Sequence, residues 1–323
     1  MAKKTGYKQK KAGYMLASEA ALKWNLSARR VRMLAQEGRI QGIIEDNGMY
    51  YIPVNAERPI DRRNAQYKGV SSDIAVIFAE IDALHHRLLN SRKLTQAELK
   101  VLREPFMVEF TYNTNAIEGS TLTLSETALV LEGMTIDKKP LKFHFDAIGN
   151  RDAFYFIEEL AKEKENINER TIKQIHSLVL TNDAVNKGIY RNVPVMITGA
   201  AHIPPQPYLI APQIEQLLRE YKTGKYKNKH IIEKVALFHI EFEGIHPFID
   251  GNGRTGRLLI NLELIQNGYL PIDVKYTDQQ LYYSAFNAYH KEGVIDNMIR
   301  LIAEYEKAEL QKYLDVVSYG KKI

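Results

Sequence analysis

The chain has 323 residues, of which 45% are hydrophobic and 26% charged, and it contains no cysteine. This length allows two or three domains with cores of their own, and the composition is that of an ordinary globular protein. Without cysteine there are no disulfide bonds and no cysteine-ligated zinc sites. No apolar run approaches the length of a bilayer span, and the basic N-terminus lacks a signal-peptide core, so we expect a cytoplasmic protein with no membrane contact.

The net charge of +5 is unevenly distributed along the chain. Residues 1–66 hold 13 Lys and Arg against 6 Asp and Glu, a net charge of +7, which leaves −2 for residues 67–323. Residues 1–12 contain five Lys and no acidic residue, which predicts a disordered basic arm. The basic character therefore belongs to the N-terminal segment.

Two short helices separated by a tight turn are predicted after this arm. Ser18 is expected to cap a helix through Trp24, and Ser27 a second helix that ends at Gly38. Helix, tight turn, helix is the pattern of a helix-turn-helix. Near its N-terminal end, where a recognition helix meets DNA, the second helix carries Arg29, Arg30 and Arg32.

Segments 39–44 and 49–53, joined through Asp46-Asn47-Gly48, have the pattern of a hairpin wing. With the two helices, they make about residues 13–60 resemble the winged helix-turn-helix of the MerR and excisionase type. This resemblance implies DNA binding by the three arginines. A solvated basic face, a protein partner, or packing on the rest of the chain are the alternatives. Residues 59–63 are predicted to form a linker.

From residue 71 to about 180 the apolar residues recur at helical spacing. A helix over 110–117 is expected to end near Gly119, a natural helix C-cap. Glu118 stands in its last turn, where the helix dipole disfavours a carboxylate, so a cationic partner elsewhere in the chain is predicted. Further on, β-branched residues alternate over 193–197 between Gly and Pro residues, which predicts a short strand or hairpin.

Residues 246–257, with the sequence His-Pro-Phe-Ile-Asp-Gly-Asn-Gly-Arg-Thr-Gly-Arg, lie between two predicted helices. The glycines let the backbone approach a ligand, and the N-terminus of the following helix favours anions. Arg254 and Arg257 share a face on the first helical turn and can bind two phosphates, while Asp250 can hold a divalent cation against them. His246 is available as a proton acceptor. The segment predicts a polyphosphate site with a general base beside it.

This segment resembles the motif of the Fic-domain family, His-Pro-Phe-x-Asp/Glu-Gly-Asn-Gly-Arg-x-x-Arg, at every fixed position. Most members of that family move AMP from ATP to a Ser, Thr or Tyr hydroxyl of a protein. The resemblance implies that His246 deprotonates the hydroxyl and that Asp250 holds Mg²⁺, with Mn²⁺ as an alternative. It assigns the anion hole to Gly251, Asn252 and Gly253, the β- and γ-phosphates to Arg254 and Arg257, and loop anchoring to Phe248.

Thr114-x-x-x-Glu118-Gly119 resembles the inhibitory helix motif of the same family. The implied mechanism is that Glu118 pairs with Arg257, repels the γ-phosphate of ATP and leaves the α-phosphate misaligned for in-line attack. In some self-inhibited members this glutamate positions water to remove AMP again. The sequence does not separate inhibition from reversal.

Other site residues are implied by position. The flap that would dock the target by strand addition includes Val195, Met196, Ile197, Gly199 and His202. Tyr282 and Tyr283 would lie beside the adenine. Family members often have Asn and then Gly-Asp shortly afterwards, whereas this chain has His-Lys-Glu-Gly at 290–293. That departure leaves the base and ribose contacts open.

We therefore expect a mainly α protein, with a helical Fic core and a small β-hairpin flap, preceded by a small winged helix-turn-helix domain. The expected segments are a basic arm at 1–12, the winged domain at 13–66, an N-terminal helical part at 67–170 with the inhibitory helix at about 110–119, the Fic core at 171–305, and a helix end and tail at 306–323. The competing hypotheses are an AMP transferase, an AMP-removing phosphodiesterase on the same site, and a nucleotide-sensing DNA-binding regulator. Self-modification and homo-oligomerisation stay open.

Overall fold

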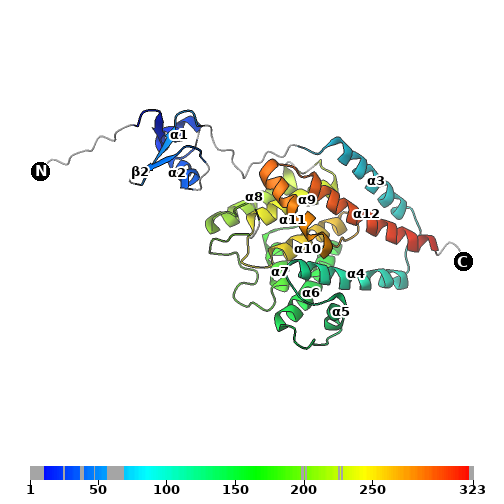
Figure 1. The fold of residues 1–323 in the computed structure, drawn as a ribbon. Coiled ribbons are helices and arrows are strands. Elements are labelled where there is room, and N and C mark those ends of the chain that lie inside the picture. Colours follow the sequence, from blue (N-terminus) through cyan, green and yellow to red (C-terminus); the bar gives the residue numbers. More distant parts are fainter. Residues whose placement is uncertain are drawn as a thin grey trace. The chain divides into compact units, whose positions relative to one another are not determined.

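The computed structural model describes residues 11–24, 26–36, 40–46, 48–56, 69–197, 200, 202–224, 226 and 228–319. The chain forms two compact units that divide between residues 64 and 65 (Figure 1). Residues 1–10 of the arm predicted at 1–12, the predicted linker at 59–63, Gly38 and Gly199 lie outside the described residues.

The first unit combines two short helices with a small antiparallel sheet. The helices are α1 (Ala17–Trp24) and α2 (Ala28–Gln36). The strands β1 (Tyr14–Leu16), β2 (Ile44–Asp46) and β3 (Met49–Pro53) pair in the order β1-β3-β2. Residues of α1, α2, β1 and β3 form a common core together with Ile40: Met15, Ala20, Ala21, Trp24, Val31, Leu34, Ala35, Ile40 and Ile52.

The expected elements of this unit are present with shifted boundaries. Ser27 caps α2 as predicted, because its Oγ accepts the N–H of Arg30 at 3.2 Å. The cap predicted at Ser18 is wrong, since α1 already begins at Ala17 and Glu19 Oε2 instead accepts the N–H of Leu16 at 2.8 Å. The strand predicted at 39–44 is found at Ile44–Asp46, because residues 41 and 42 form a turn.

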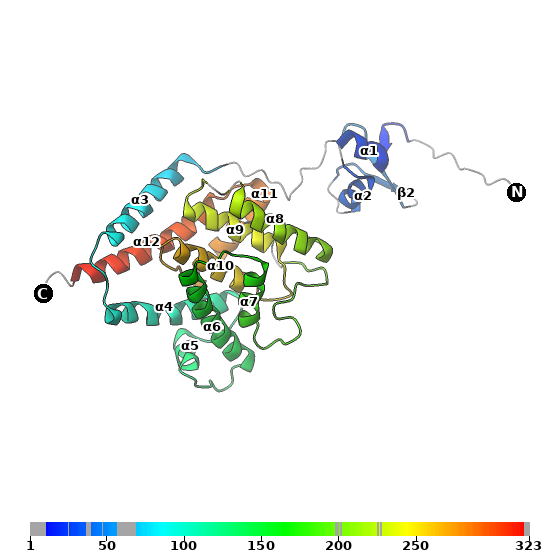
Figure 2. The same cartoon turned by 180° about the vertical axis from the view of Figure 1, so that it is seen from behind.

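The second unit is helical throughout its described residues, apart from the connecting segments (Figures 1 and 2). Its α-helices are α3 (Ser72–Leu89), α4 (Gln96–Ile117), α5 (Leu124–Leu131), α6 (Leu141–Glu163), α7 (Glu169–Val179), α8 (Ile210–Thr223), α9 (Ile231–Ile245), α10 (Asn252–Gln266), α11 (Gln279–Glu292) and α12 (Asp296–Tyr319). Short 3₁₀ turns, η2 (Pro207–Leu209) and η3 (Tyr276–Asp278), precede α8 and α11. Capping boxes at Thr95 and Thr123 fix where α4 and α5 begin.

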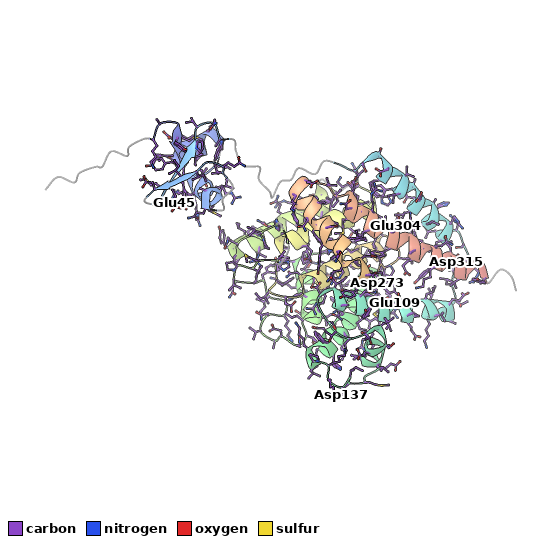
Figure 3. All side chains as sticks on the ribbon, in the orientation of Figure 1. Glu45, Glu109, Asp137, Asp273, Glu304 and Asp315 are labelled. Atoms are coloured by element: carbon purple, nitrogen blue, oxygen red, sulfur yellow. The ribbon has the colours of Figure 1, made fainter. Side chains whose placement is uncertain are left out.

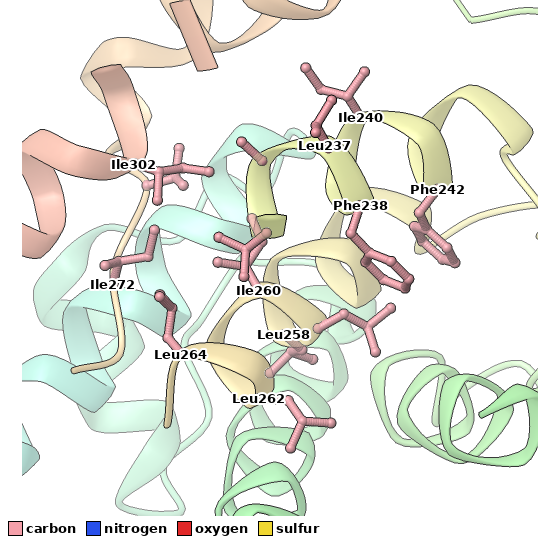
Figure 4. Close-up of a cluster of buried hydrophobic side chains, with 14 of the residues drawn as sticks. Leu237, Phe238, Ile240, Phe242, Leu258, Ile260, Leu262, Leu264, Ile272 and Ile302 are labelled. Atoms are coloured by element: carbon pink, nitrogen blue, oxygen red, sulfur yellow. The ribbon is translucent and has the colours of Figure 1, made fainter. Parts of the chain in front are cut away.

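Helix α10 is the centre of this unit and packs against α4, α6, α7 and α9. Its side chains are buried along almost its whole length, which is the pattern of a central helix rather than of an amphipathic surface helix. Figure 4 shows the contact with α9, where Phe238 and Phe242 face Leu258 and its neighbours. Each such side chain contributes about 1.5–3 kcal/mol when it leaves water. Hydrophobic burial thus fixes the loop that joins α9 to α10.

A buried polar network fixes α4 against the segment that follows α10. Lys275 Nζ lies 2.8 Å from Asp273 and 2.9 Å from Glu109, and Figure 3 labels both carboxylates. Asn113 of α4 donates to Asp273 at 2.7 Å. Burial raises the pKa of Asp273 to about 6 against the opposing effect of Lys275. This network sets the position of the end of α4, which carries residues 114–118.

The β-hairpin flap expected near 193–197 is not formed. Within the described part of the second unit these residues have no strand partner, so their alternating pattern has no ladder to join. Arg191 holds the segment instead, donating to the carbonyls of Val193 at 2.9 Å and Pro205 at 2.7 Å. Among the helices described, none combines the length and apolar character needed to cross a bilayer.

Gly149 is required where α6 crosses α7, because an added Cβ would collide with the main-chain carbonyl oxygen of Leu178. We expect Gly149→Ala to lower the free energy of unfolding by about 1–3 kcal/mol, the usual cost of overpacking. Urea unfolding followed by circular dichroism measures this change. Lys162→Ala, at an exposed position of the same helix, is the control and should change stability by less than about 0.5 kcal/mol. Equal stability of both variants would contradict the assignment.

Candidate active site

A pocket of about 410 Å³ opens beside the loop between α9 and α10. Residues from α4, α9, α10, α11 and the segment before η2 converge on it. The lining residues are Glu118, Ile197, Ala200, His202, Glu243, His246, Gly253, Arg257, Tyr282, Tyr283, Phe286, Asn287 and His290. Segments that are 100 residues or more apart in sequence therefore meet at the predicted base and phosphate site.

His246 occupies the C-terminal end of α9 in a left-handed conformation, with φ 49° and ψ 62°. This conformation is uncommon for a residue other than glycine, and it ends the helix at this point. Arg191 stabilises the turn by donating from Nε to the carbonyl of His246 at 2.8 Å, while its N–H donates to Pro247 at 2.9 Å. The side chain of His246 is 21% exposed and lines the pocket.

The loop after His246 is closed by side chains that bond its own backbone. Asn252 accepts the N–H of Phe248 at 2.8 Å and donates to its carbonyl at 2.9 Å. Gly251, at φ 76°, begins α10 with no side-chain cap. The first N–H groups of a helix have no partner within the helix, so an uncapped start presents donors and a positive dipole end to an anion.

His176 of α7 supports this loop from behind. Its ring stacks on Phe248 with centroids 3.6 Å apart. Nδ1 lies 2.8 Å from the N–H of Gly188 and must accept, so Nε2 carries the proton and donates to the carbonyl of Asp250 at 2.9 Å. Burial lowers the pKa of His176 to about 4, which keeps the ring neutral at pH 7. His176 is thus an interior residue of α7.

Arg257 is 2% exposed and is held entirely by α4 and α11 within the described residues. It donates from Nε to Thr114 Oγ1 at 2.8 Å and from Nη2 to the carbonyl of Thr114 at 3.0 Å. Glu118 Oε1 accepts from Nη2 at 2.7 Å. The cationic partner predicted for Glu118 is thus Arg257. The carboxylate also lies against Gly253, where an added Cβ would collide with Oε1.

Arg254 has a different environment from Arg257 and is not among the pocket-lining residues of the described chain. Its Nη1 lies 2.9 Å from Asp146, and its Nη2 lies 3.2 Å from Asp250. Lys142 approaches the other oxygen of Asp250 at 3.3 Å. Burial acts to raise the pKa of Asp250, but Arg254 and Lys142 outweigh it and lower the pKa.

The carboxylate of Asp250 is the oxygen ligand that a divalent cation needs, and its lowered pKa keeps it ionised. Within the described residues, no group of three or more His, Asp or Glu side chains forms a ready-made metal site. A magnesium ion on Asp250 would therefore complete its coordination with water and phosphate oxygens, as is usual for this ion. The residues fit such an ion if Lys142 moves aside.

The end of the pocket away from α10 is formed by aromatic rings. His202 stacks on His290 with centroids 4.1 Å apart, and its Nε2 lies 2.6 Å from the carbonyl of Gly244. Tyr282 is buried, with its hydroxyl 2.6 Å from His239, whereas Tyr283 is 44% exposed. Of the two tyrosines predicted beside the adenine, Tyr283 is the more accessible one.

The structure brings together most of the residues predicted from the motif and adds two that were missed. Glu243 lines the pocket three residues before His246, a helical spacing that could have revealed it. Asp146 binds Arg254 across 108 positions of sequence, and no local pattern points to that contact. Different carboxylates hold the two arginines predicted to bind phosphates, and of the two only Arg257 lines the pocket within the described residues.

Comparisons with known proteins agree with this geometry. Residues 166–264 match the model of the Fic/DOC family. Over 222 residues the chain is 32% identical to the protein adenylyltransferase Fic of Drosophila ananassae, an alignment that covers 68% of this chain and 44% of the relative. The chain thus spans less than half the length of the curated relatives that it matches.

Two solved structures share the fold of the second unit. A fragment of Fic-1 from C. elegans superposes with a TM-score of 0.69 and 27% identity, covering 77% of this chain and 74% of the fragment. A Fic domain-containing signaling protein from Bacteroides thetaiotaomicron gives a TM-score of 0.66 and 25% identity, covering 76% of this chain and 98% of that one. The fold is therefore of the Fic class. The chain contains a Fic domain, whose motif is the loop at 246–257.

The buried histidine stack should make stability depend on pH. Burial lowers the pKa of His290 from 6.5 to about 3, so below pH 6.5 the unfolded chain binds a proton that the folded chain excludes. The contribution of neutral His290 to the unfolding free energy is fully present above pH 6.5 and is lost as the pH falls toward 3. When the pH is lowered from 7.5 to 5, we expect the unfolding free energy of wild type to fall by about 2 kcal/mol more than that of His290→Phe. Urea unfolding of both proteins at the two pH values measures this difference. An identical pH dependence would contradict this.

Proposed function

We propose that this chain is a protein adenylyltransferase, which moves AMP from ATP to a Ser, Thr or Tyr hydroxyl of a protein target. The observation that carries the proposal is a single pocket that presents His246, Gly253 and Arg257 at the start of α10. The activity named for the relatives supports the same reaction. The chain itself is included among the targets to be tested.

In the proposed reaction His246 accepts the proton of the target hydroxyl. The freed oxygen forms a bond to the α-phosphorus, the bond from that phosphorus to the bridging oxygen of the β-phosphate breaks, and pyrophosphate leaves with the electron pair. Such a transfer depends on positioning and on cationic groups at the developing charge rather than on covalent chemistry by the protein. The left-handed turn at His246 and the bonds from Arg191 hold the base in one place.

The phosphates would lie at the uncapped start of α10. The main-chain N–H groups of Gly251, Asn252 and Gly253 would form the anion hole, since α10 begins without a side-chain cap. The N–H of Gly251 donates to Asp250 Oδ1 at 2.6 Å and would have to leave that acceptor to bind an anion. Arg257 would bind the γ-phosphate after releasing Glu118, and Arg254 the β-phosphate after rearranging its contacts. A magnesium or manganese ion on Asp250 would neutralise phosphate charge.

Thr114, Glu118 and Gly119 would form the inhibitory element of this site. Glu118 takes the Nη2 donor of Arg257 and places negative charge against Gly253, where phosphate would approach. Gly119, at φ 90°, ends α4 immediately after the carboxylate. Thr114 keeps two bonds to Arg257 that do not involve Glu118, so the guanidinium retains partners when the carboxylate is removed.

We expect Glu118→Gly to raise AMP transfer on the order of 100-fold, because alignment of the α-phosphate is restored. His246→Ala should abolish transfer in either background. The measurement is intact mass of the purified protein and candidate targets after incubation with ATP and Mg²⁺, together with incorporation of labelled AMP. An unchanged rate in Glu118→Gly would refute the inhibitory role, and transfer by His246→Ala would refute the base.

Removal of AMP is the alternative reaction, since Glu118 and His246 line the same pocket. A glutamate there can orient a water molecule toward the α-phosphorus of a modified target. Release of AMP from a modified protein by wild type, lost in Glu118→Gly, would favour this alternative over inhibition.

The segment at 195–202 would dock the target. Met196 is 89% exposed, Val195 is half-buried, and Ile197 and His202 line the pocket. Their backbone carries no strand partner within the described residues, so a target segment could add as a strand. Gly199, assigned to the same flap, lies outside the described residues.

We also propose that the first unit binds duplex DNA through α2. Arg29 and Arg32 are exposed and Arg30 is half-buried, while Val31, Leu34 and Ala35 face the core. A short helix with a basic outer face beside a small antiparallel wing fits the geometry of major-groove recognition. A protein partner that binds the same face is the competing occupant.

Replacing Arg29 and Arg32 together with Ala should weaken DNA binding and lower the salt slope of log K by about 2, because two phosphate contacts are lost. Fluorescence anisotropy of a labelled duplex over a range of salt measures both effects. Lys100→Ala, on an exposed lysine of α4, is the control and should change neither. Equal salt slopes in the double variant and wild type would contradict the assignment.

A further inference from the structure

Glu243 lies on the last turn of α9, and its side chain is 12% exposed. Its Oε2 is 3.6 Å from Nδ1 of His246. Both residues line the pocket. The helical spacing of three residues and the left-handed turn at His246 bring the carboxylate to the imidazole nitrogen nearest the helix.

Both side chains contain a buried polar atom that has no hydrogen-bond partner in the described structure: Nδ1 of His246 and Oε1 of Glu243. Buried polar atoms are usually paired, so Nδ1 of His246, which faces Oε2 of Glu243, calls for an explanation. Two buried polar groups at this separation could pair with each other after a small movement.

The other charged and titratable groups around His246 have different partners. Glu118 is bound to Arg257, on α4 and α10. His202 approaches the carbonyl of Gly244 and stacks on His290 of α11. Burial lowers the pKa of both His202 and His290, so both rings are neutral at pH 7. Within the described residues, no arginine or lysine forms an ion pair with Glu243, whereas Glu118 is paired with Arg257. The carboxylate beside His246 is therefore not neutralised.

Glu243 also has little space in which to turn away from His246. On its far side, Oε1 lies 2.9 Å from the position that a Cβ at residue 256 would occupy. Gly256 leaves room for the carboxylate, while the ring of His239 fills the remaining space at the same glycine. Gly256 and His239 thus limit the movement of the carboxylate on the side of Gly256.

We propose that Glu243 is a positioning residue that holds the Nδ1–H of His246, so that Nε2 keeps its lone pair as the proton acceptor. A distance of 3.6 Å is too long for a hydrogen bond, and a small rotation of either side chain would close the contact. When Nε2 takes the hydroxyl proton, the carboxylate faces the resulting imidazolium, as in a Ser-His-Asp triad. The role in proton transfer rests on the proposed transferase function. The Nδ1–H tautomer of His246 can be measured whether or not the chain transfers AMP.

The test measures the tautomer of His246 by ¹⁵N NMR of histidine-labelled protein, with the signal assigned through His246→Ala. In wild type above pH 8 we expect the Nδ1–H tautomer to predominate. In Glu243→Ala the signal should move toward the Nε2–H form that the free histidine side chain prefers. Glu292→Ala, on an exposed glutamate of α11, is the matched control and should leave the signal unchanged. An unchanged signal in Glu243→Ala would overturn the proposal.

Kinetics in the Glu118→Gly background supply the second readout. Adding Glu243→Ala should lower kcat between about 100- and 10,000-fold with little change in KM for ATP, because the base is misoriented while the phosphate contacts remain. A tautomer change with unaltered kcat, or a loss confined to KM, would overturn the positioning role. If Glu243→Ala fails to fold, Glu243→Gln serves instead, because it keeps the volume of the side chain. It should give smaller changes in the same direction, and the absence of any change would contradict the proposal.

The two readouts separate this inference from the proposed function. The tautomer measurement needs no ATP, so it decides whether Glu243 orients His246 even if no variant transfers AMP. Absence of transfer by Glu118→Gly with an intact tautomer effect would refute the transferase function alone.

Discussion

The contact between Arg257 and the end of α4 is the interaction on which the site depends. A guanidinium that is 2% exposed needs partners for its charge and its donors, and Thr114 and Glu118 supply them from one helical turn. Thr114 and Glu118 occupy these donors, so the charge of Arg257 is already neutralised within the folded chain.

The loop beside this pair is rigid for a separate reason. His246 is fixed by its left-handed turn and by Arg191, while Asn252 closes the loop on Phe248 and His176 supports it from behind. Apart from the ring stack of His176 on Phe248, these contacts are made to backbone groups of the loop and do not depend on the side chains that face the pocket. A preorganised loop of this kind suits chemistry that relies on placement.

Much of the helical framework follows from local patterns. Apolar spacing predicts a helix before the segment at 246–257, which is α9 in the structure, and that segment identifies the loop. The flap hairpin and the cap at Ser18 were predicted wrongly for different reasons. An alternating pattern needs a partner strand, which a short window of sequence does not reveal. At the start of α1, the adjacent Glu19 accepts the backbone N–H of Leu16, and the helix already begins at Ala17.

The sequence by itself determined the chemical inventory of the site: one imidazole, one carboxylate, a glycine-rich turn and two guanidinium groups in twelve consecutive positions. Only the tertiary structure decided which side chains pair with these groups. Arg254 is bound by Asp146 of α6, Arg257 by Glu118 of α4, and Asp250 by Lys142, all across more than 100 residues. Such pairings depend on how helices pack around α10, and packing is a property of the whole core rather than of any local stretch.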